Sequence, residues 1–247
     1  MKAFAKSDVG RTRQVNEDSY CLLQNANGDW LAVVCDGIGG SAAGEVASSM
    51  AIKVLRDAFL KAPKLKKDSM VNRWLRENLN KANDSIYLES MRNKKERGMG
   101  TTCVGMLYTN KKTYIFNVGD SRVYAYYADG LIQMSEDHSV VARLIKEGKI
   151  SVEESKHHAQ RNTLTNALGI WRAFRIDINR IDSNFKYILV CSDGLHGYVA
   201  HEDIAKVIVC DCGVPEKVET LVSMANQAGG YDNCTVILLE NEGDSNA

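Results

Sequence analysis

Proline is nearly absent from this sequence, and several features that would mark a specialised class of protein are missing as well. Two Pro occur, at 63 and 215, and no Ser- or Gly-rich linker interrupts the 247 residues, so we expect one domain spanning residues 1–247. No apolar run approaches the ~20 residues that a membrane-spanning helix requires, and the N-terminus shows no secretory signal. We therefore expect a soluble, cytoplasmic protein without a membrane partner.

An excess of charge of either sign is also missing. Lys and Arg total 31, as do Asp and Glu, so the formal net charge is zero. A protein that coats nucleic acid needs an excess of Lys and Arg to neutralise phosphates, so we expect no nucleic-acid partner. Hydrophobic residues at 45% and charged residues at 25% are ordinary for a globular protein and argue against a disordered chain.

The seven cysteines match no metal-binding spacing. No Cys-x-x-Cys pair occurs, and Cys210 and Cys212 are too close in sequence to form a zinc knuckle on their own. A cysteine in an apolar, strand-like run behaves as a small hydrophobe, so we expect reduced, buried thiols. The cysteines in such runs are Cys35, Cys103, Cys191 and Cys234.

What the sequence does contain is a series of short apolar runs with the composition of β-strands. They carry Val, Ile, Tyr and Thr, which fit a pleated surface. Turn-like sequences at 25–28 and 128–130 favour hairpins and antiparallel sheets. The predicted strands are residues 20–23, 30–35, 103–107, 113–118, 123–127, 187–191 and 235–239.

Two amphipathic helices are predicted between these strands, from about Ser41 to residue 60 and from about Asp68, a plausible N-cap. Val71 and Leu75 begin an apolar stripe at helical spacing in the second helix. The stretch 41–98 contains no predicted strand, which is unlike strict β-α-β alternation. We therefore predict an α+β fold in which antiparallel sheets carry helices on their outer faces.

Acidic residues stand at the ends of the predicted strands, beside Gly, Ser or Asn. If these ends converge, two carboxylates ~4 Å apart repel by about 1 kcal/mol even in water, and the cluster needs cations. Oxygen ligands without matching His or Cys favour Mg²⁺ or Mn²⁺ over zinc. The acids concerned are Glu17, Asp18, Asp36, Asp120, Asp193 and Asp232.

At these residues the sequence resembles the metal-dependent protein phosphatase family, the PP2C-type serine/threonine phosphatases, and most of all its bacterial branch. The matching segments follow the expected order along nearly the whole chain. They are residues 7–18, 33–40, 98–102, 117–122, 137–139, 161–162, 164–165, 167–169, 191–195 and 232–235.

The resemblance implies a PP2C-like α-β-β-α sandwich of two antiparallel sheets flanked by helices, with metals at one end and a flap segment at about 140–172. It implies a phosphoric monoester hydrolase that removes phosphate from phosphoserine and phosphothreonine by a metal-activated water. The implied partners are phosphoproteins and a cognate Ser/Thr kinase with its substrates. We expect a monomer. The implied cofactors are two core Mn²⁺ or Mg²⁺ ions and a weaker third.

By the same resemblance, six residues of this chain would hold the metals. Asp36 would bridge both core ions, and Asp193 and Asp232 would complete the first site. The Gly37 carbonyl and, through water, Glu17 would serve the second site. Asp120 would share the third ion with Asp193.

Three further residues acquire roles from the resemblance. Arg13 would grip the substrate phosphate, which suits its bidentate fork. Asp18 would orient the attacking water, and Asn233 would support the site. Many eukaryotic members carry a His, a candidate general acid, where this chain has Ile38. The proton donor is therefore open between a water on the third metal and, as the weaker candidate, His138.

Two alternative functions fit the residues of this sequence less well. A dinucleotide-binding module fits Gly-x-Gly-x-x-Ala at 37–42, but the acid about 20 residues on, Asp57, lies inside a predicted helix. A catalytically weak fold-mate acting as scaffold or sensor should have lost ligands, yet Asp36, Asp193 and Asp232 are all present. No Cys-x₅-Arg or Asp-x-Asp nucleophile motif occurs, which excludes phosphatases of those classes.

Overall fold

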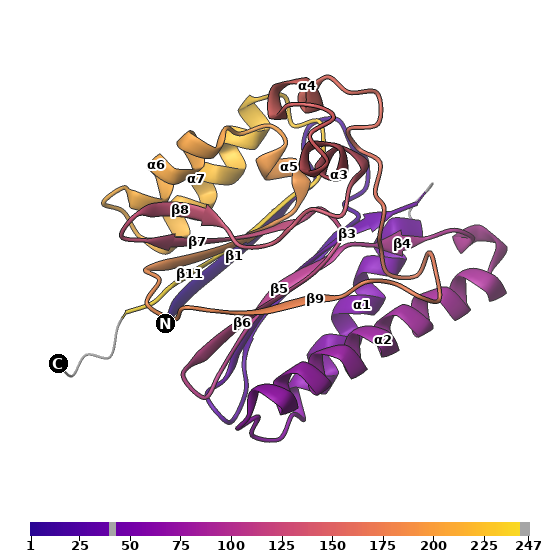
Figure 1. Ribbon diagram of the computed structural model, residues 1–247, viewed down its shortest axis with the longest axis horizontal. Helices are drawn as coiled ribbons and strands as arrows, with labels where there is room; N and C mark the ends of the chain where they lie inside the picture. Colours follow the sequence, from indigo (N-terminus) through magenta and orange to yellow (C-terminus); the bar gives the residue numbers. More distant parts are fainter. Residues whose placement is uncertain (40–42, 243–247) are drawn as a thin grey trace.

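Two antiparallel sheets lie face to face, with helices on both outer faces, in the computed structural model, which describes residues 1–39 and 43–242 (Figure 1). The predicted α+β sandwich is therefore confirmed. Helices cover the outer face of each sheet, and the two inner faces pack against one another. The predicted start of the first helix at Ser41, and Gly40 and Ala42 of the glycine-rich segment, lie outside the described residues.

The first sheet has the order β1 (Lys2–Asp8), β11 (Cys234–Glu240), β10 (Tyr187–Cys191), β7 (Arg122–Tyr127) and β8 (Gly130–Gln133). The second has the order β2 (Asp18–Gln24), β3 (Trp30–Ile38), β5 (Cys103–Thr109), β6 (Lys112–Val118) and β9 (Asp177–Ile181), and β4 (Gly100–Thr101) pairs with β3. All seven predicted strands are present. Three edge strands, β1, β8 and β9, and the two-residue strand β4 were not predicted, because their sequences carry too few apolar residues in alternation.

The helices α1 (Ala43–Leu60) and α2 (Asp68–Arg92) cover the second sheet, followed by the 3-10 turn η1 (Lys94–Glu96). The helices α6 (His201–Val209) and α7 (Val214–Gln227) cover the first and were not predicted. The segment 140–172, the expected flap, carries α3 (Val140–Lys146) and α4 (Val152–Lys156), and α5 (Asp193–His196) follows β10. None of the helices within the described ranges is both long and apolar enough to cross a membrane.

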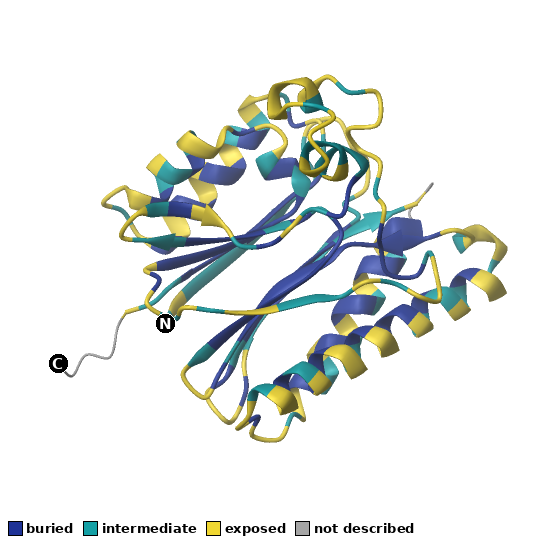
Figure 2. Ribbon diagram, in the orientation of Figure 1, coloured by how far each residue is buried: buried dark blue, intermediate teal, exposed yellow. Residues whose placement is uncertain are grey.

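The core has three layers, because successive side chains of a strand point to opposite faces of its sheet. In β3, Leu31 and Val33 face the helices, whereas Ala32 and Val34 face the other sheet. Both faces are therefore buried, as the dark strands of Figure 2 show. This explains why the central strands appear in the sequence as continuous apolar runs.

The cysteines divide into two groups. Five are free and buried, in agreement with the sequence: Cys21, Cys35, Cys103, Cys191 and Cys234. Cys210 and Cys212, in the turn between α6 and α7, are joined by a disulfide. The expectation of reduced thiols is wrong for this pair, which lies outside the apolar strands.

Asp68 does not cap α2, contrary to expectation, because Lys67 is the N-cap residue. Instead the Asp68 carboxylate accepts hydrogen bonds from Lys112 Nζ (2.6 Å), Tyr114 Oη (3.0 Å) and Arg180 Nη1 (2.9 Å). Through these donors it ties α2 to strands β6 and β9. The bonds from Lys112 and Tyr114 lower the pKa of Asp68 to about 2.

Replacing Asp68 by Asn should destabilise the fold at neutral pH, because the two cationic partners lose their counter-charge. A depressed folded-state pKa contributes stability that is present above the unfolded value of ~3.9 and is lost as the pH falls toward 2. The urea midpoint of Asp68→Asn should therefore lie below that of the wild type at pH 7, and the gap should close between about pH 4 and pH 2. Asp84→Asn, an exposed change on the same helix, is the control. A difference in urea midpoint that persists unchanged at pH 2 would contradict a stabilising role for the ionised Asp68 carboxylate.

Candidate functional site

Two acids face each other on neighbouring strands of the second sheet. The β2–β3 register places Asp18 directly opposite Asp36. The backbone of Asp36 is fixed by Thr102, whose Oγ1 accepts from the Asp36 N–H (2.9 Å) and whose N–H donates to the Asp36 carbonyl (2.8 Å). Like charges directly opposite one another destabilise a sheet, so this pair needs a compensating cation or proton.

Three more acids stand at the corresponding end of the first sheet. Asp193 follows β10, which lies between β7 and β11. Asp120 precedes β7 and Asp232 precedes β11, and because these strands are antiparallel to β10, both acids lie beside its end. Strand order alone therefore gathers acids that are far apart in sequence.

The carboxyl groups of Asp36 and Asp193 come from the two sheets and lie close enough to affect each other's ionisation. Desolvation, followed by the repulsion of neighbouring carboxylates, raises the pKa of Asp36 well above its ordinary value. Desolvation likewise raises the pKa of Asp120 strongly, and that of Asp193 to about 6. These side chains keep some exposed surface but are crowded by protein atoms, so the charged forms are poorly hydrated.

Asp18 is held by two hydroxyls. Its Oδ2 accepts from Ser192 Oγ (2.7 Å) and Thr235 Oγ1 (2.6 Å), whereas its Oδ1 is buried without a hydrogen-bond partner among the described residues. Burial raises the pKa of Asp18 to about 7. An unpartnered buried carboxylate oxygen is costly and points to a missing cation or donor. The sequence did not reveal the hydroxyl anchors, since an isolated Ser or Thr carries no chemical signature.

Glu17 and Gly37 lie on the α1 side of the acids. Gly37 N–H donates to the Glu17 carbonyl (3.1 Å), and a Cβ at Gly37 would overlap that carbonyl and the Gly44 backbone. Only glycine allows this close approach. The Glu17 Oε1 accepts from the Gly44 N–H (3.2 Å) at the start of α1, and burial raises the pKa of Glu17.

Asn233 organises the N-terminal loop beside the site. Its Oδ1 accepts from the Glu17 N–H (2.8 Å), and its Nδ2 donates to the carbonyls of Val9 (2.9 Å) and Val15 (3.1 Å). The loop between those two carbonyls carries Arg13. The resemblance predicts a supporting role for Asn233, and these bonds show what it supports: the loop that carries Arg13 and the backbone of Glu17.

Arg13 lies at the mouth of the cluster, where its Nη2 donates to Asp232 Oδ2 over 2.9 Å. The other Asp232 oxygen, Oδ1, accepts from the Asn233 N–H (2.9 Å). The Arg13 side chain is 47% exposed, so it can turn toward solvent or a ligand. The family resemblance predicts that Arg13 binds the substrate phosphate. In this structure Arg13 instead pairs with Asp232, an expected metal ligand.

Two histidines hold the Asp120 turn. His196 Nε2 donates to the Asp120 carbonyl over 3.0 Å, and burial lowers the pKa of His196 well below its ordinary value, which keeps the imidazole neutral. His138 accepts from the Gly119 N–H at Nδ1 (3.2 Å) and donates from Nε2 to Asp177 (3.0 Å). Both ring nitrogens of His138 thus form hydrogen bonds within the protein. His196 was missed because it belongs to no strand-end pattern.

As they stand, no three or more His, Cys, Asp or Glu side chains of residues 1–39 and 43–242 are arranged to hold a metal ion. Arg13 engages Asp232, and hydroxyls engage Asp18. The donor set nevertheless fits hard divalent cations, since it consists of oxygens and its crowded carboxyls have raised pKa values. The unpartnered Oδ1 of Asp18 fits the same interpretation. Rotation of Arg13 away from Asp232 would free that carboxylate.

Comparison with known proteins gives a consistent result. A family model described as protein phosphatase 2C matches residues 10–229. The chain is 35% identical over 241 residues to the serine/threonine phosphatase stp of Listeria welshimeri, covering 97% of this chain and 96% of that protein. It is 32% identical over 247 residues to protein phosphatase PhpP of Streptococcus pneumoniae, covering 99% and 100%.

Solved structures agree with these sequence relatives. A crystal structure of a bacterial serine phosphatase matches with a TM-score of 0.91 and 36% identity, covering 99% of each chain. The Mycobacterium tuberculosis serine/threonine phosphatase PstP/Ppp matches with a TM-score of 0.84 and 30% identity, covering 98% of this chain and 99% of that one.

Neutralising Asp36 should stabilise the protein in the presence of a chelator. A folded-state pKa raised above the unfolded value means that stability is present in acid and is lost as the pH rises. Asp36→Asn removes that penalty, and we expect its melting temperature in chelator at pH 7.5 to exceed that of the wild type by about 2–4 °C or more. Near pH 4 the difference should vanish, because Asp36 is then protonated. Asp129→Asn, in an exposed turn, is the control. A lower melting temperature for Asp36→Asn at pH 7.5 contradicts the crowding argument.

Proposed function

The chain belongs to the protein phosphatase 2C family and is a protein phosphatase, and we propose that it hydrolyses phosphoserine and phosphothreonine in proteins at a centre of two Mn²⁺ or Mg²⁺ ions, with a weaker third. The observation that carries the proposal is the gathering of acids from both sheets at one end of the sandwich. Asp18 lies directly opposite Asp36 in the second sheet, and its carboxylate accepts from Ser192 and Thr235 of the first sheet, where Asp193 follows Ser192.

In the proposed assignment Asp36 serves both core ions, Asp193 and Asp232 the first, and the Gly37 carbonyl and Glu17 the second. Asp120 would share the third ion with Asp193. Divalent ions at such a centre lower the pKa of a bound water and shield phosphoryl charge. The crowding of these carboxyls supports the assignment, because a cation would stabilise their ionised forms.

The chain's own groups position the reactants. Asp18, fixed through Oδ2 by Ser192 and Thr235, presents Oδ1 as an acceptor that orients the attacking water. Arg13 releases Asp232 and donates its guanidinium fork to the substrate phosphate, a geometry that matches two phosphate oxygens. Asn233 holds the loop that carries Arg13 beside Glu17. The Arg13 guanidinium therefore approaches the phosphate from the N-terminal loop.

The remaining expectations belong to the same proposal. Residues 1–247 would act as one domain, with the segment 140–172 as a flap that borders the cleft and contacts the protein substrate. The partners would be phosphoproteins and a cognate Ser/Thr kinase, met by a monomer in the cytoplasm. The names of the relatives, serine/threonine phosphatases, support this substrate class. The alternative, a catalytically weak scaffold or sensor, is disfavoured because the sequence has lost none of Asp36, Asp193 and Asp232.

Hydrolysis of phosphoserine and phosphothreonine peptides should require added divalent metal. Chelator should abolish turnover, and Mn²⁺ should restore it, because hard oxygen ligands hold such ions reversibly with water in the coordination sphere. Phosphate release from matched peptides is the measurement, with a phosphotyrosine peptide for comparison. Full turnover in excess chelator would overturn the metal centre, whereas no turnover at any metal concentration would favour the scaffold.

Arg13→Ala should act mainly on substrate binding. A hydrogen bond to a charged group contributes about 1.5–3 kcal/mol, so KM for a phosphopeptide should rise roughly tenfold or more, while kcat changes less. Arg11→Ala, a nearby arginine without an ion pair among the described residues, is the matched control. An unchanged KM with a collapsed kcat would show that Arg13 instead controls Asp232.

A further inference from the structure

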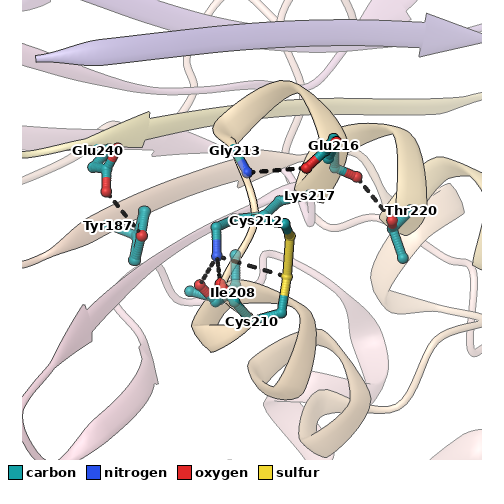
Figure 3. The surroundings of a disulfide bond; sticks show 9 residues. All are labelled: Tyr187, Ile208, Cys210, Cys212, Gly213, Glu216, Lys217, Thr220 and Glu240. Atoms are coloured by element: carbon teal, nitrogen blue, oxygen red, sulfur yellow. Dashed lines mark hydrogen bonds between the residues drawn. A yellow bond between two sulfur atoms is a disulfide. The ribbon is translucent and has the colours of Figure 1, made fainter.

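The two cysteines that are not buried form a pair at the junction of α6 and α7 (Figure 3). Cys210 is exposed, Cys212 is half-buried, and a disulfide joins them across the single residue Asp211. None of the residues in the proposed phosphatase site belongs to this junction. We propose that Cys210 and Cys212 are an exchangeable redox site that reacts with low-molecular-weight thiols and disulfides.

The cross-link is poorly suited to a structural role. Stabilisation by a disulfide grows with the length of the chain it closes, and this one encloses one residue. The junction is also held without sulfur, since Cys210 N–H donates to Val207 O (3.3 Å) and Gly213 N–H to Glu216 Oε2 (3.2 Å). The Lys217 N–H in turn donates to Gly213 O (3.0 Å). Because these bonds do not need the disulfide, the pair can open and close in the folded protein.

A buried lysine activates the pair. Lys217 is 1% exposed, and its Nζ donates to the carbonyls of Ile208 (2.7 Å) and Cys210 (2.5 Å). The same Nζ lies 3.9 Å from Cys210 Sγ. Figure 3 marks this contact with a dashed line. A cation beside a thiol stabilises the thiolate, the form that attacks a disulfide and the form that leaves when one is reduced.

Other charges near Lys217 are consistent with this role. Burial lowers the pKa of its ammonium group and the nearby cation of Lys186 lowers it further, whereas Glu240 and Asp211 counter part of that effect. Asp211 also opposes the thiolate form of its neighbours, but its side chain is exposed, so water and salt screen it. The Lys217 ammonium is thus a shielded charge within 3.9 Å of the sulfur.

Exchange balances as a two-electron reaction. The Cys210 thiolate attacks one sulfur of an external disulfide, whose S–S bond breaks and releases one external thiolate. The Cys212 thiolate then attacks Cys210 Sγ in the mixed disulfide and releases the second. The protein pair is oxidised, the external disulfide is reduced to two thiols, and the two protons of the cysteine thiols pass to solvent or to the released thiolates. Dithiothreitol or glutathione drives the reverse reaction.

Thiol counting on the intact protein tests the proposal. After treatment with dithiothreitol and its removal, 5,5′-dithiobis(2-nitrobenzoate) should release two equivalents of thiolate rapidly and leave the pair oxidised. The five buried cysteines should react only in denaturant and serve as internal controls. The variant with both Cys210→Ser and Cys212→Ser should lose the fast phase and keep its phosphatase activity. A pair that resists reduction until the protein unfolds, or reacts no faster than the other five, contradicts the proposal.

The role of Lys217 has a separate readout. Lys217→Met should slow the fast phase at pH 7 at least threefold, Lys217→Arg should retain it, and Lys206→Met on the exposed face of α6 should leave it unchanged. If Lys217→Met does not fold, the pH–rate profile of the wild type decides. The midpoint of that profile should lie below the ~8.5 of an ordinary thiol. A midpoint at or above that value would contradict stabilisation of the thiolate by Lys217.

Discussion

The crowding of carboxylates at one end of the sandwich is the constraint on which the rest of the site depends. Asp18 and Asp36 oppose each other across β2 and β3, and Asp193 reaches Asp36 from the other sheet. Such an arrangement is unstable by itself, because each buried charge raises the cost of the next. A fold can retain it only if cations or protons neutralise it, which is the role that the proposed metal ions would fill.

The sandwich supplies the rigidity that this crowding requires. The inner faces of both sheets are filled with aliphatic side chains, so the strand ends cannot separate to relieve repulsion without losing the layer between them. Hydrogen bonds fix the acids individually: hydroxyls hold Asp18, Thr102 holds the backbone of Asp36, and His196 holds the Asp120 turn. The preorganised, charged site is thus built on strands, and the adaptable element, Arg13, comes from a loop.

The sequence predicted the parts of this structure that repeat regular patterns. Central strands such as Trp30–Ile38 were found because both faces are buried, and the stripe beginning at Val71 identified α2. The strand-end acids were found by position, but only the fold shows that Asp18 lies directly opposite Asp36. The edge strand β9 was missed because its sequence is polar, and the hydroxyls of Ser192 and Thr235 because their role depends on a neighbour distant in sequence. The partners of Asp68 and Lys217 escaped prediction for the same reason.

Calorimetric titration of the metal-free protein with Mn²⁺ tests the central claim most directly. The account predicts at least two ions per chain, bound with release of protons near pH 7, because carboxyls with raised pKa values must ionise to coordinate them. Repeating the titration in buffers of different ionisation enthalpy measures that release. In Asp36→Asn the core binding should be lost. Equal stoichiometry and affinity in the wild type and Asp36→Asn, with no proton release, would contradict the claim that this acidic cluster is a metal centre.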